Sequence, residues 1–266
     1  MRTLSFKSPA TVAMVASMLI GLAGCEAVQP TPTCRVRPSQ YAARYAVEGS
    51  PQGMCTDKVL TGEIIHLNFF RNKSDYAEGA PSVGIEAASV ADAWAAAKDM
   101  MPAPTGVEYS QGDFTTPRPG SDDMCHAPTL SEAKITTPMA SLSYKWSNFA
   151  VIVSPLSAAI YFGADLERKD GDCTVKYKVS AIYPAHHCGD GKTPRLDDKG
   201  MPVLDEKTKE PLFDDDPTTG KPVQDKCNPV QGSGLYPDIE YICDATPDGL
   251  KGSHLCLPKQ DFPRLK

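Results

Sequence analysis

The stretch AAIYFGADLERKDGDCTVKYKVSAIY, residues 158–183, decides the fold class of this chain. Its two halves, 158–168 and 173–183, flank Lys169-Asp170-Gly171-Asp172. Asp-Gly between two alternating runs is the strongest short-range signal for a β-hairpin. Val175, Tyr177, Val179, Ala181 and Tyr183 fall on one face, and Thr174, Lys176, Lys178 and Ser180 fall on the other. The stretch therefore predicts an antiparallel sheet with one face in water.

The same period of two recurs on both sides of this hairpin. Residues 41–47 (YAARYAV) and 63–70 (EIIHLNFF) alternate and predict a pair of strands joined through Ser50-Pro51-Gln52-Gly53. Residues 142–153 (LSYKWSNFAVIV) and 239–243 (IEYIC) also have strand character. These segments predict a mainly β domain, either an antiparallel sandwich or an up-and-down barrel, with one short helix and a long polar insertion.

The helix is predicted to begin near Ser89. The sequence Ser89-Val90-Ala91-Asp92 resembles a capping box with Asp in place of Glu or Gln, and Pro102 marks the end. A stripe at helical spacing is formed by Val90, Trp94, Ala97 and Met101. We interpret Trp94 as a core anchor rather than a ligand contact.

The N-terminus has the features of an export signal. Arg2 and Lys7 precede residues 10–22, a run of thirteen residues without charge. A transmembrane helix needs about 20 apolar residues, so this run is short for a permanent span. A positive start, a short apolar middle and a small-residue end are typical of a secretory signal peptide.

The signal ends in Leu22-Ala23-Gly24-Cys25, which resembles the bacterial lipobox. The resemblance implies cleavage before Cys25 and attachment of lipid, such as palmitate, to its sulfur and its amine. Several acyl chains together anchor a protein stably where one binds only marginally. Glu26, in place of Asp, implies sorting to the outer membrane of the cell envelope. The mature region also resembles uncharacterised exported lipoproteins of Gram-negative bacteria in its general character.

The predicted export signal and lipobox define the predicted domain organisation. Residues 1–24 form the lipoprotein signal peptide, and residues 25–38 form a lipidated tether whose prolines favour extended backbone. Residues 39–266 form a single β-rich domain that carries an acidic insertion at residues 189–226. The insertion contains ten acids, seven bases and few apolar residues, so its weak repeats of about ten residues are too small to have their own cores.

Net charge limits the partners of the mature chain. The full sequence has a formal charge of −6, and loss of residues 1–24 removes Arg2 and Lys7 and no acid, which gives −8. An acidic surface argues against nucleic acid, because phosphates are met by Lys and Arg. It also argues against a polybasic contact with anionic lipid.

The number of cysteines supports the prediction that the chain is exported. With Cys25 lipidated, eight cysteines remain in an exported chain, an even number that predicts up to four disulfides in the periplasm or at the cell surface. These disulfide candidates are Cys34, Cys55, Cys125, Cys173, Cys188, Cys227, Cys243 and Cys256. Eight cysteines allow 105 connectivities. We predict pairing of sequence neighbours, namely Cys34–Cys55, Cys125–Cys173, Cys188–Cys227 and Cys243–Cys256.

Metal chemistry has weak signals. The acids of the insertion could offer oxygen ligands to calcium, with Asp214, Asp216 and Asp225 as weak candidates. Counted from Asp214, however, the glycine of an EF-hand loop falls one position late and the closing Glu is absent. His186-His187-Cys188 and Cys125-His126 lack the ligand spacing of zinc sites. We therefore predict no metal and no cofactor, with calcium as the alternative.

Catalytic motifs are equally weak. Ser131-Glu-Ala-Lys134 matches S-x-x-K, but the partner motifs of penicillin-interacting enzymes are missing. Gly191-Lys192-Thr193 resembles the end of a phosphate loop, but His186 stands where its first glycine belongs. We predict a non-catalytic, membrane-anchored lipoprotein that binds an envelope protein or serves envelope structure. The alternative is a carrier of a small apolar ligand, in a barrel cavity lined by residues such as Phe69, Tyr161 and Tyr177.

Overall fold

The computed structural model describes the following residues: 32–51, 53–71, 80–137, 141–153, 160–189, 192–195, 197, 201, 203–205, 207, 209, 212–215, 221–229, 234–245 and 254–262. The predicted signal peptide, Cys25 and the tether up to residue 31 lie outside the described residues, so what the sequence predicts for them stays a prediction. Residues Pro32–Lys266 form one compact unit.

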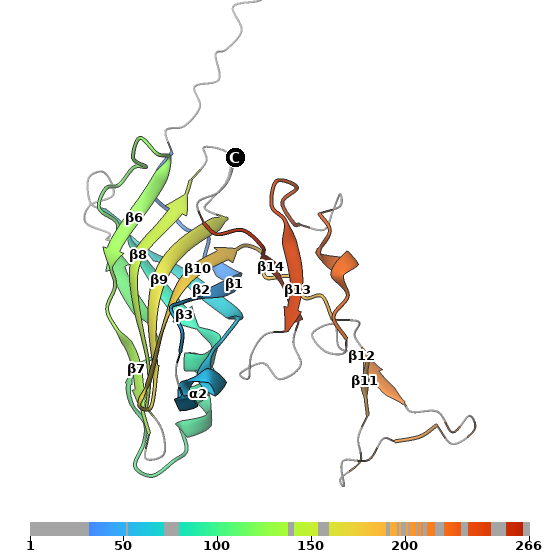
Figure 1. Cartoon of the computed structure of the whole chain (residues 1–266). Coiled ribbons are helices and arrows are strands. Elements are labelled where there is room, and N and C mark those ends of the chain that lie inside the picture. Colours follow the sequence, from blue (N-terminus) through green and yellow to red (C-terminus); the bar gives the residue numbers. More distant parts are fainter. Residues whose placement is uncertain are drawn as a thin grey trace, which may run out of the picture. The chain divides into compact units, whose positions relative to one another are not determined.

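The main feature of this unit is one ten-stranded antiparallel sheet (Figure 1). Its strands are β1 (Ser39–Glu48), β2 (Gly62–Phe70), β3 (Ser82–Ala87), β4 (Thr105–Val107), β5 (Ser110–Asp113), β6 (Met124–Thr129), β7 (Ala133–Thr136), β8 (Ser141–Ile152), β9 (Tyr161–Asp170) and β10 (Cys173–Ile182). Their order is β4-β7-β8-β9-β10-β1-β2-β3-β5, and β6 also pairs with β8. Two meanders, β8-β9-β10 and β1-β2-β3, are thus joined where β10 pairs with β1.

The sheet curls into a nearly closed barrel. Its far edge, β5, meets the segment that follows β6, because the Ser131 amide donates to the Gln111 carbonyl at 2.8 Å and the Thr115 amide donates to the His126 carbonyl at 2.8 Å. The backbones are so close that a Cβ on Gly112 would lie 2.5 Å from the Thr129 carbonyl oxygen, so glycine is required there. The mainly β, antiparallel prediction is confirmed, and of its two architectures the structure has the barrel.

The hairpin of residues 158–183 forms as predicted. Asp170 pairs with Cys173, which leaves Gly171 and Asp172 as a two-residue loop. Gly171 has φ +61°, a left-handed conformation that glycine adopts without steric penalty. The strands β1 and β2 also pair, although their connection is longer than predicted and contains the 3-10 turn η2 (Gly53–Lys58).

The barrel interior is filled with side chains. Inward positions alternate along each strand, so the face predicted for residues 175–181 is buried. The largest buried side chains of this cluster are Trp146, Tyr41, Tyr144, Tyr177, Phe114, Phe149, Phe162, Ile65, Leu67, Ile85 and Ile135. Aromatic rings pack edge-on or tilted against one another, as Tyr45 does with Tyr177 at a centroid separation of 5.3 Å.

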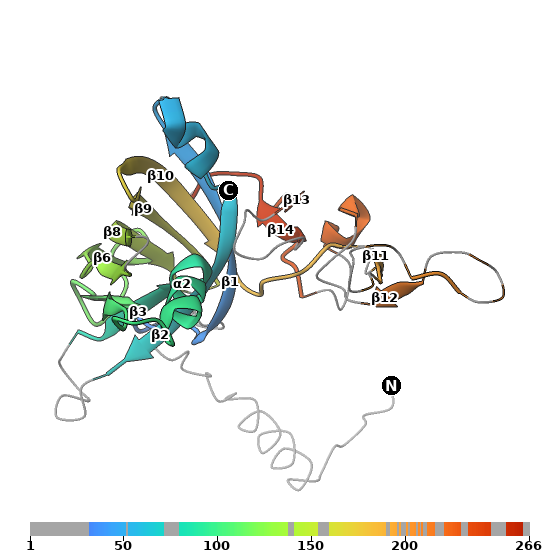
Figure 2. The ribbon, with the colours of Figure 1, turned by 90° about the horizontal axis from the view of Figure 1, so that it is seen from below.

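The helix α2 (Ala88–Ala97) follows β3 directly and packs on β2, β3, β7 and β8 (Figure 2). Val90 and Ala97 are buried, and Trp94 packs against the core as predicted. The predicted apolar stripe of the helix is wrong at Met101. The helix ends at Ala97, and the Met101 side chain is 91% exposed. Among the described residues, no helix has both the length and the apolar character to cross a bilayer.

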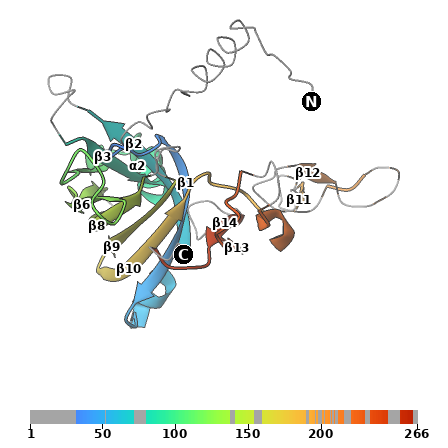
Figure 3. The same cartoon turned by 90° about the horizontal axis from the view of Figure 1, so that it is seen from above.

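The C-terminal region covers part of the outer face of the barrel. It contains β11 (Lys192–Pro194), β12 (Phe213–Asp215), the 3-10 turn η4 (Gln224–Cys227), β13 (Tyr241–Ala245) and β14 (His254–Pro258). β14 lies against β1 and β10 (Figure 3), where Leu255 and Leu257 pack on Ala42. This corrects the prediction of an outer face fully in water, since Ser180 and Ile182 on that face are buried.

Candidate functional site

The disulfides staple segments that are distant in sequence. All eight predicted cysteines are paired, but each of the four predicted pairings is wrong. The bonds are Cys34–Cys125, Cys55–Cys173, Cys188–Cys243 and Cys227–Cys256. Neighbour pairing fails because packing between distant segments decides which cysteines meet, in the barrel for Cys34–Cys125 and Cys55–Cys173 and beside the β13–β14 hairpin for the other two. Thus η2 packs on β10 and brings Cys55 to the first residue of that strand, Cys173.

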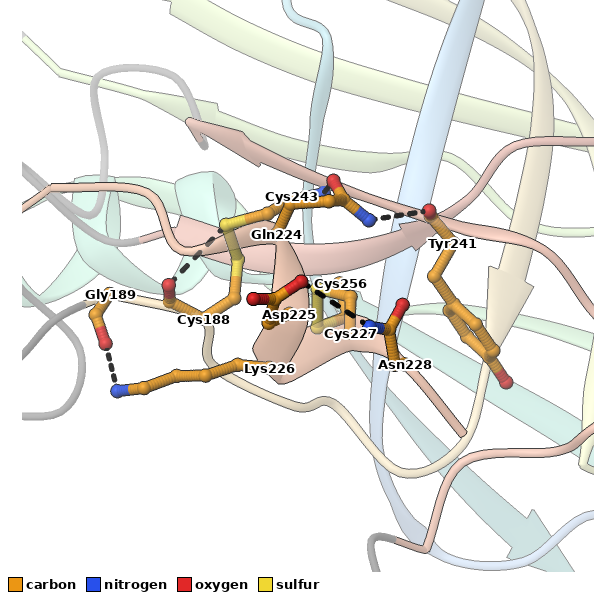
Figure 4. The surroundings of a disulfide bond; sticks show 10 residues. All are labelled: Cys188, Gly189, Gln224, Asp225, Lys226, Cys227, Asn228, Tyr241, Cys243 and Cys256. Atoms are coloured by element: carbon orange, nitrogen blue, oxygen red, sulfur yellow. Dashed lines mark hydrogen bonds between the residues drawn. A yellow bond between two sulfur atoms is a disulfide. The ribbon is translucent and has the colours of Figure 1, made fainter. Parts of the chain in front are cut away.

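Two of these disulfides lie side by side at the base of the insertion (Figure 4). The sulfur atoms of Cys188, Cys227 and Cys243 all lie within 4.8 Å of one another. A sulfur cluster of this kind could hold a soft metal only as thiolates, and here each sulfur belongs to a disulfide. The arrangement therefore fixes the two ends of the insertion to β13 and β14.

Hydrogen bonds also hold the two ends of the insertion together. Gly189 and Pro222 form a β-bridge across the two ends of the insertion, and the ammonium of Lys226 donates to the Gly189 carbonyl. The Gln224 amide donates to the Tyr241 carbonyl at 3.0 Å and accepts from the Cys243 amide at 2.9 Å. The base is thus a closed neck from which residues 190–221 extend.

Aspartates in the insertion hold turns. The Asp197 carboxylate accepts from the Met201 amide at 2.9 Å, and the Asp205 carboxylate accepts from the Lys207 amide at 2.8 Å. Asp side chains commonly close turns in this way, which accounts for part of the weak repeat. Met201 is 62% exposed and Leu204 is 48% exposed between them. The described part of the insertion therefore presents apolar side chains in a charged segment.

Of the three calcium candidates, only the Asp225 side chain is described by the structure. Asp225 is exposed in η4, where its carboxylate accepts from the Asn228 amide at 3.4 Å. Asp214 lies in β12 opposite Thr193, and Asp216 lies outside the described residues. Among the described residues, the carboxylates form no cluster of three ligand groups. Calcium binding stays a prediction.

The remaining sequence motifs are used in structural contacts. The Ser131 hydroxyl accepts from the Gln111 amide at 2.8 Å, and Lys134 pairs with Val107 between β7 and β4. His126 contacts the Asp122 carboxylate at 2.9 Å and lowers the pKa of that carboxyl. Burial and then the nearby charge of Lys226 lower the pKa of His186.

A buried charged network inside the barrel was missed by the sequence reasoning. The Glu63 carboxylate is buried and accepts from the hydroxyls of Tyr45 at 2.6 Å and Tyr144 at 2.9 Å. Its other oxygen accepts from the amide and the hydroxyl of Ser89, each at 2.8 Å. Glu63 thereby caps the N-terminus of α2 from a neighbouring strand, where a carboxylate is favoured. The capping role predicted for Ser89 and Asp92 is wrong, since α2 has no side-chain cap of its own.

Arg168 extends this network. Its guanidinium donates to the Tyr144 hydroxyl at 3.1 Å, to the Lys58 carbonyl at 3.0 Å and to the Asp170 carboxylate at 2.9 Å. Burial would lower the pKa of Arg168, but Tyr144 and Asp170 outweigh it and raise that pKa. The sequence gives one indication that these two charged side chains point inward. Glu63 and Arg168 occupy the same alternating positions as the inward-facing residues of their strands.

The residues proposed for a carrier cavity do not line one space. Tyr177 is fully buried inside the barrel, where its hydroxyl accepts from the Leu60 amide at 3.1 Å. Phe69 packs against the same interior cluster. Tyr161 lies on the outer face, where it packs on Phe262 at a centroid separation of 5.0 Å. Filling of the interior by rings argues against the carrier alternative.

Two hollows lie on the outer face. One, of about 430 Å³, lies over β9 and β10 and is lined by Asn148, Gly163, Ala164, Asp165, Lys178, Val179, Ser180, Asp261 and Phe262. A smaller hollow, of about 230 Å³, lies beside α2 and is lined by Gln40, Ile64, His66, Glu86, Ala88, Ala91 and Asp92.

These features define a class of protein: an antiparallel barrel cross-linked by disulfides, with a core of buried aromatic side chains and a polar insertion whose two ends are held together. A family model described as MlpA matches residues 39–184, more than half of the chain, so the chain belongs to the MlpA family. The match begins at the first residue of β1 and ends two residues after β10, and thus covers the main sheet without the insertion.

A related protein extends the comparison beyond the sheet. Over 254 residues the chain is 23% identical to the Myxococcus xanthus protein named "Putative lipoprotein MlpA", with 92% of each chain covered. The chain thus belongs to a family of lipoproteins, which is consistent with a membrane-associated place in the cell envelope. No solved structure matches the chain.

Proposed function

We propose that this protein is anchored to the outer membrane by lipid on Cys25 and binds a protein partner, without catalysis, through its insertion. The lipoprotein family and the lipobox of residues 22–25 support the anchor. The prolines at residues 30, 32 and 38 favour an extended tether that lifts the barrel off the lipid surface.

One observation carries the partner contact: the insertion is cross-linked at its base, and apolar side chains are exposed in its described part. Two adjacent disulfides fix its neck, whereas Met201 and Leu204 are exposed in the segment beyond. Protein interfaces are commonly centred on a few apolar residues surrounded by polar ones. The net charge of −3 in residues 189–226, from ten acids and seven bases, favours a partner with a basic contact surface.

The anchor has a direct test. Cys25→Ser in the full-length chain is expected to abolish incorporation of radiolabelled palmitate and to release the protein from outer-membrane fractions. The matched control is Ser17→Ala within the apolar run, which keeps the lipobox intact. Continued labelling of the Cys25→Ser chain would contradict the lipid assignment.

The partner contact is tested by photo-crosslinking in intact cells. A benzophenone amino acid is placed at position 204 of the insertion or, as the matched control, at exposed position 145 of β8. A discrete crosslinked protein from position 204 and none from position 145 supports the proposal. Equal products at both positions, or none at position 204, would refute it.

A shortened chain separates the insertion from the barrel. Because Gly189 and Pro222 already form a β-bridge, residues 190–221 can be replaced by Gly-Gly without removing any cysteine. We expect this chain to remain lipidated and folded by circular dichroism but to lose the crosslinked protein from co-purification. Retention of that protein would place the contact on the barrel instead.

A further inference from the structure

The larger outer hollow is built like a ligand site. Its volume of about 430 Å³ lies within the range of about 300–1,000 Å³ that is usual for small-molecule sites. One wall is formed by the strands β8, β9 and β10, and the opposite wall by Asp261 and Phe262 from the C-terminal segment. Residues from four separate parts of the chain thus converge on one space.

The C-terminal wall is pinned to the barrel. The Phe262 amide donates to the Ser180 hydroxyl at 2.9 Å, and the guanidinium of Arg44 pairs with the Asp261 carboxylate. The Phe262 ring lies over Gly163, where a Cβ would come within 2.3 Å of a ring carbon. A glycine on β9 therefore allows an aromatic ring to form one side of the hollow.

The strand wall carries oriented polar groups. The Asp165 carboxylate accepts from the Lys178 ammonium at 2.5 Å and from the Asn148 amide at 2.7 Å. Burial raises the pKa of Asp165, but these two hydrogen bonds outweigh it and lower that pKa, so the group stays an acceptor at neutral pH. Asn148 lies in a bulge of β8 between Ser147 and Ala150 and has φ +50°. Bulges of this kind redirect side chains beside functional sites.

The charges of the hollow are paired within the protein. Lys178 is paired with Asp165 and also with Glu48 at 3.4 Å, and Asp261 is paired with Arg44. Three carboxylates, of Asp165, Glu48 and Asp261, face the two cations Lys178 and Arg44, so these groups carry a net charge of −1 and disfavour an anionic ligand. Carboxylate oxygens, an ammonium and an amide can still exchange hydrogen bonds with hydroxyls, which both donate and accept. A neutral ligand with several hydroxyls fits this wall.

We propose that the hollow lined by Asn148, Asp165, Lys178 and Phe262 binds a neutral saccharide. A sugar ring offers hydroxyls at its rim, which suit the polar wall, and an apolar C–H face, which suits the Phe262 ring. The open outer position lets a longer glycan continue beyond the bound unit. This inference does not depend on the protein contact proposed for the insertion.

The test is saturation-transfer difference NMR with the full, oxidised chain. The probes are neutral mono- and disaccharides of hexoses, pentoses and N-acetylhexosamines, with a hexose 6-phosphate and octanoate as the anionic and apolar comparators. We expect transfer to the ring protons of at least one sugar and none to octanoate. No transfer to any sugar, or stronger transfer to octanoate, overturns the inference.

Variants locate the bound sugar. Asn148→Gly keeps a residue that tolerates positive φ while it removes the amide, and Asp165→Asn removes the carboxylate. Each is expected to weaken sugar binding at least tenfold. The control Glu167→Gln lies on the same outer face of β9 but does not line the hollow, and it should leave binding unchanged. Thermal melts confirm folding, and binding that survives both site variants overturns the assignment to this hollow.

Discussion

The buried carboxylate of Glu63 gives the sharpest stability prediction. In Glu63→Gln, an amide nitrogen replaces one of two oxygens that each accept two hydrogen bonds. If the nitrogen faces Ser89, the Ser89 backbone N–H meets another donor. If it faces Tyr45 and Tyr144, their hydroxyls lose their acceptor and must turn to accept instead. A hydrogen bond to a charged group contributes about 1.5–3 kcal/mol, and an unsatisfied buried donor costs about 1–3 kcal/mol. Allowing for relaxation, we expect a loss of about 3 kcal/mol in the free energy of unfolding.

The measurement is urea unfolding of the oxidised protein followed by tryptophan fluorescence. Trp146 is a suitable reporter because it is 1% exposed and its ring centroid lies 6.2 Å from that of Tyr144. The matched control is Glu167→Gln on the outer face, where the carboxylate is 45% exposed and 3.7 Å from Lys176. Exposed pairs of this kind contribute about 0–1 kcal/mol.

A double-mutant cycle with Ser89→Ala isolates the contact of the Ser89 hydroxyl with Glu63. Alanine removes this hydrogen bond and keeps the one from the backbone amide, so the two substitutions should couple by about 0.5–3 kcal/mol. If Glu63→Gln changes the free energy of unfolding by less than about 0.5 kcal/mol, the network does not hold α2 to the barrel and our reasoning is wrong.

Three further predictions concern the disulfides, the C-terminal wall and the tyrosines. Replacing Cys55 and Cys173 by alanine opens a loop of 118 residues, so the loop-entropy model predicts a loss of about 5 kcal/mol, measurable by urea unfolding. Gly163→Ala should displace Phe262, because the new Cβ would meet its ring at 2.3 Å; faster amide exchange at residues 259–262 with an unchanged core checks this. Burial raises the pKa of Tyr241 to about 12 from 10, so its contribution to stability is complete below pH 10 and is lost as pH rises towards 12. Absorbance at 295 nm should therefore show fewer tyrosines ionised at pH 11 in the native protein than in guanidinium chloride, and equal titration in both would contradict the burial.

The strands were predictable because their signals are local. Alternation and an Asp-Gly turn are properties of a few consecutive residues, and they predicted the β9–β10 hairpin and its inward face. The meeting of β10 with β1 is not local, since it joins residues such as Val179 and Tyr45 that are far apart in sequence. The disulfide pairing likewise depends on contacts between distant segments, in the barrel and at the base of the insertion, so neighbour pairing failed.

The outer hollow could be predicted only in fragments. Asn148 interrupts the alternation that runs through residues 142–153, which is a signal for a bulge, but nothing in the sequence indicates that it meets Asp165. The approach of Phe262 depends on how the C-terminal segment crosses the barrel. Glu63 and Arg168 could be recognised as inward-facing from their phase alone, whereas their hydroxyl partners come from other strands.

The Cys34–Cys125 disulfide has a mechanical consequence. Cys34 lies five residues before β1, and Cys125 lies in β6, which is paired with β8. In the lipid-anchored form proposed above, a pull from the membrane would enter the barrel at a covalent cross-link before it reached β1. That strand, paired with β2 on one side and β10 on the other, is spared from being peeled out of the sheet end first. The disulfide would therefore bear a force applied at the N-terminal side of the barrel and protect the hydrogen bonds of β1 from it.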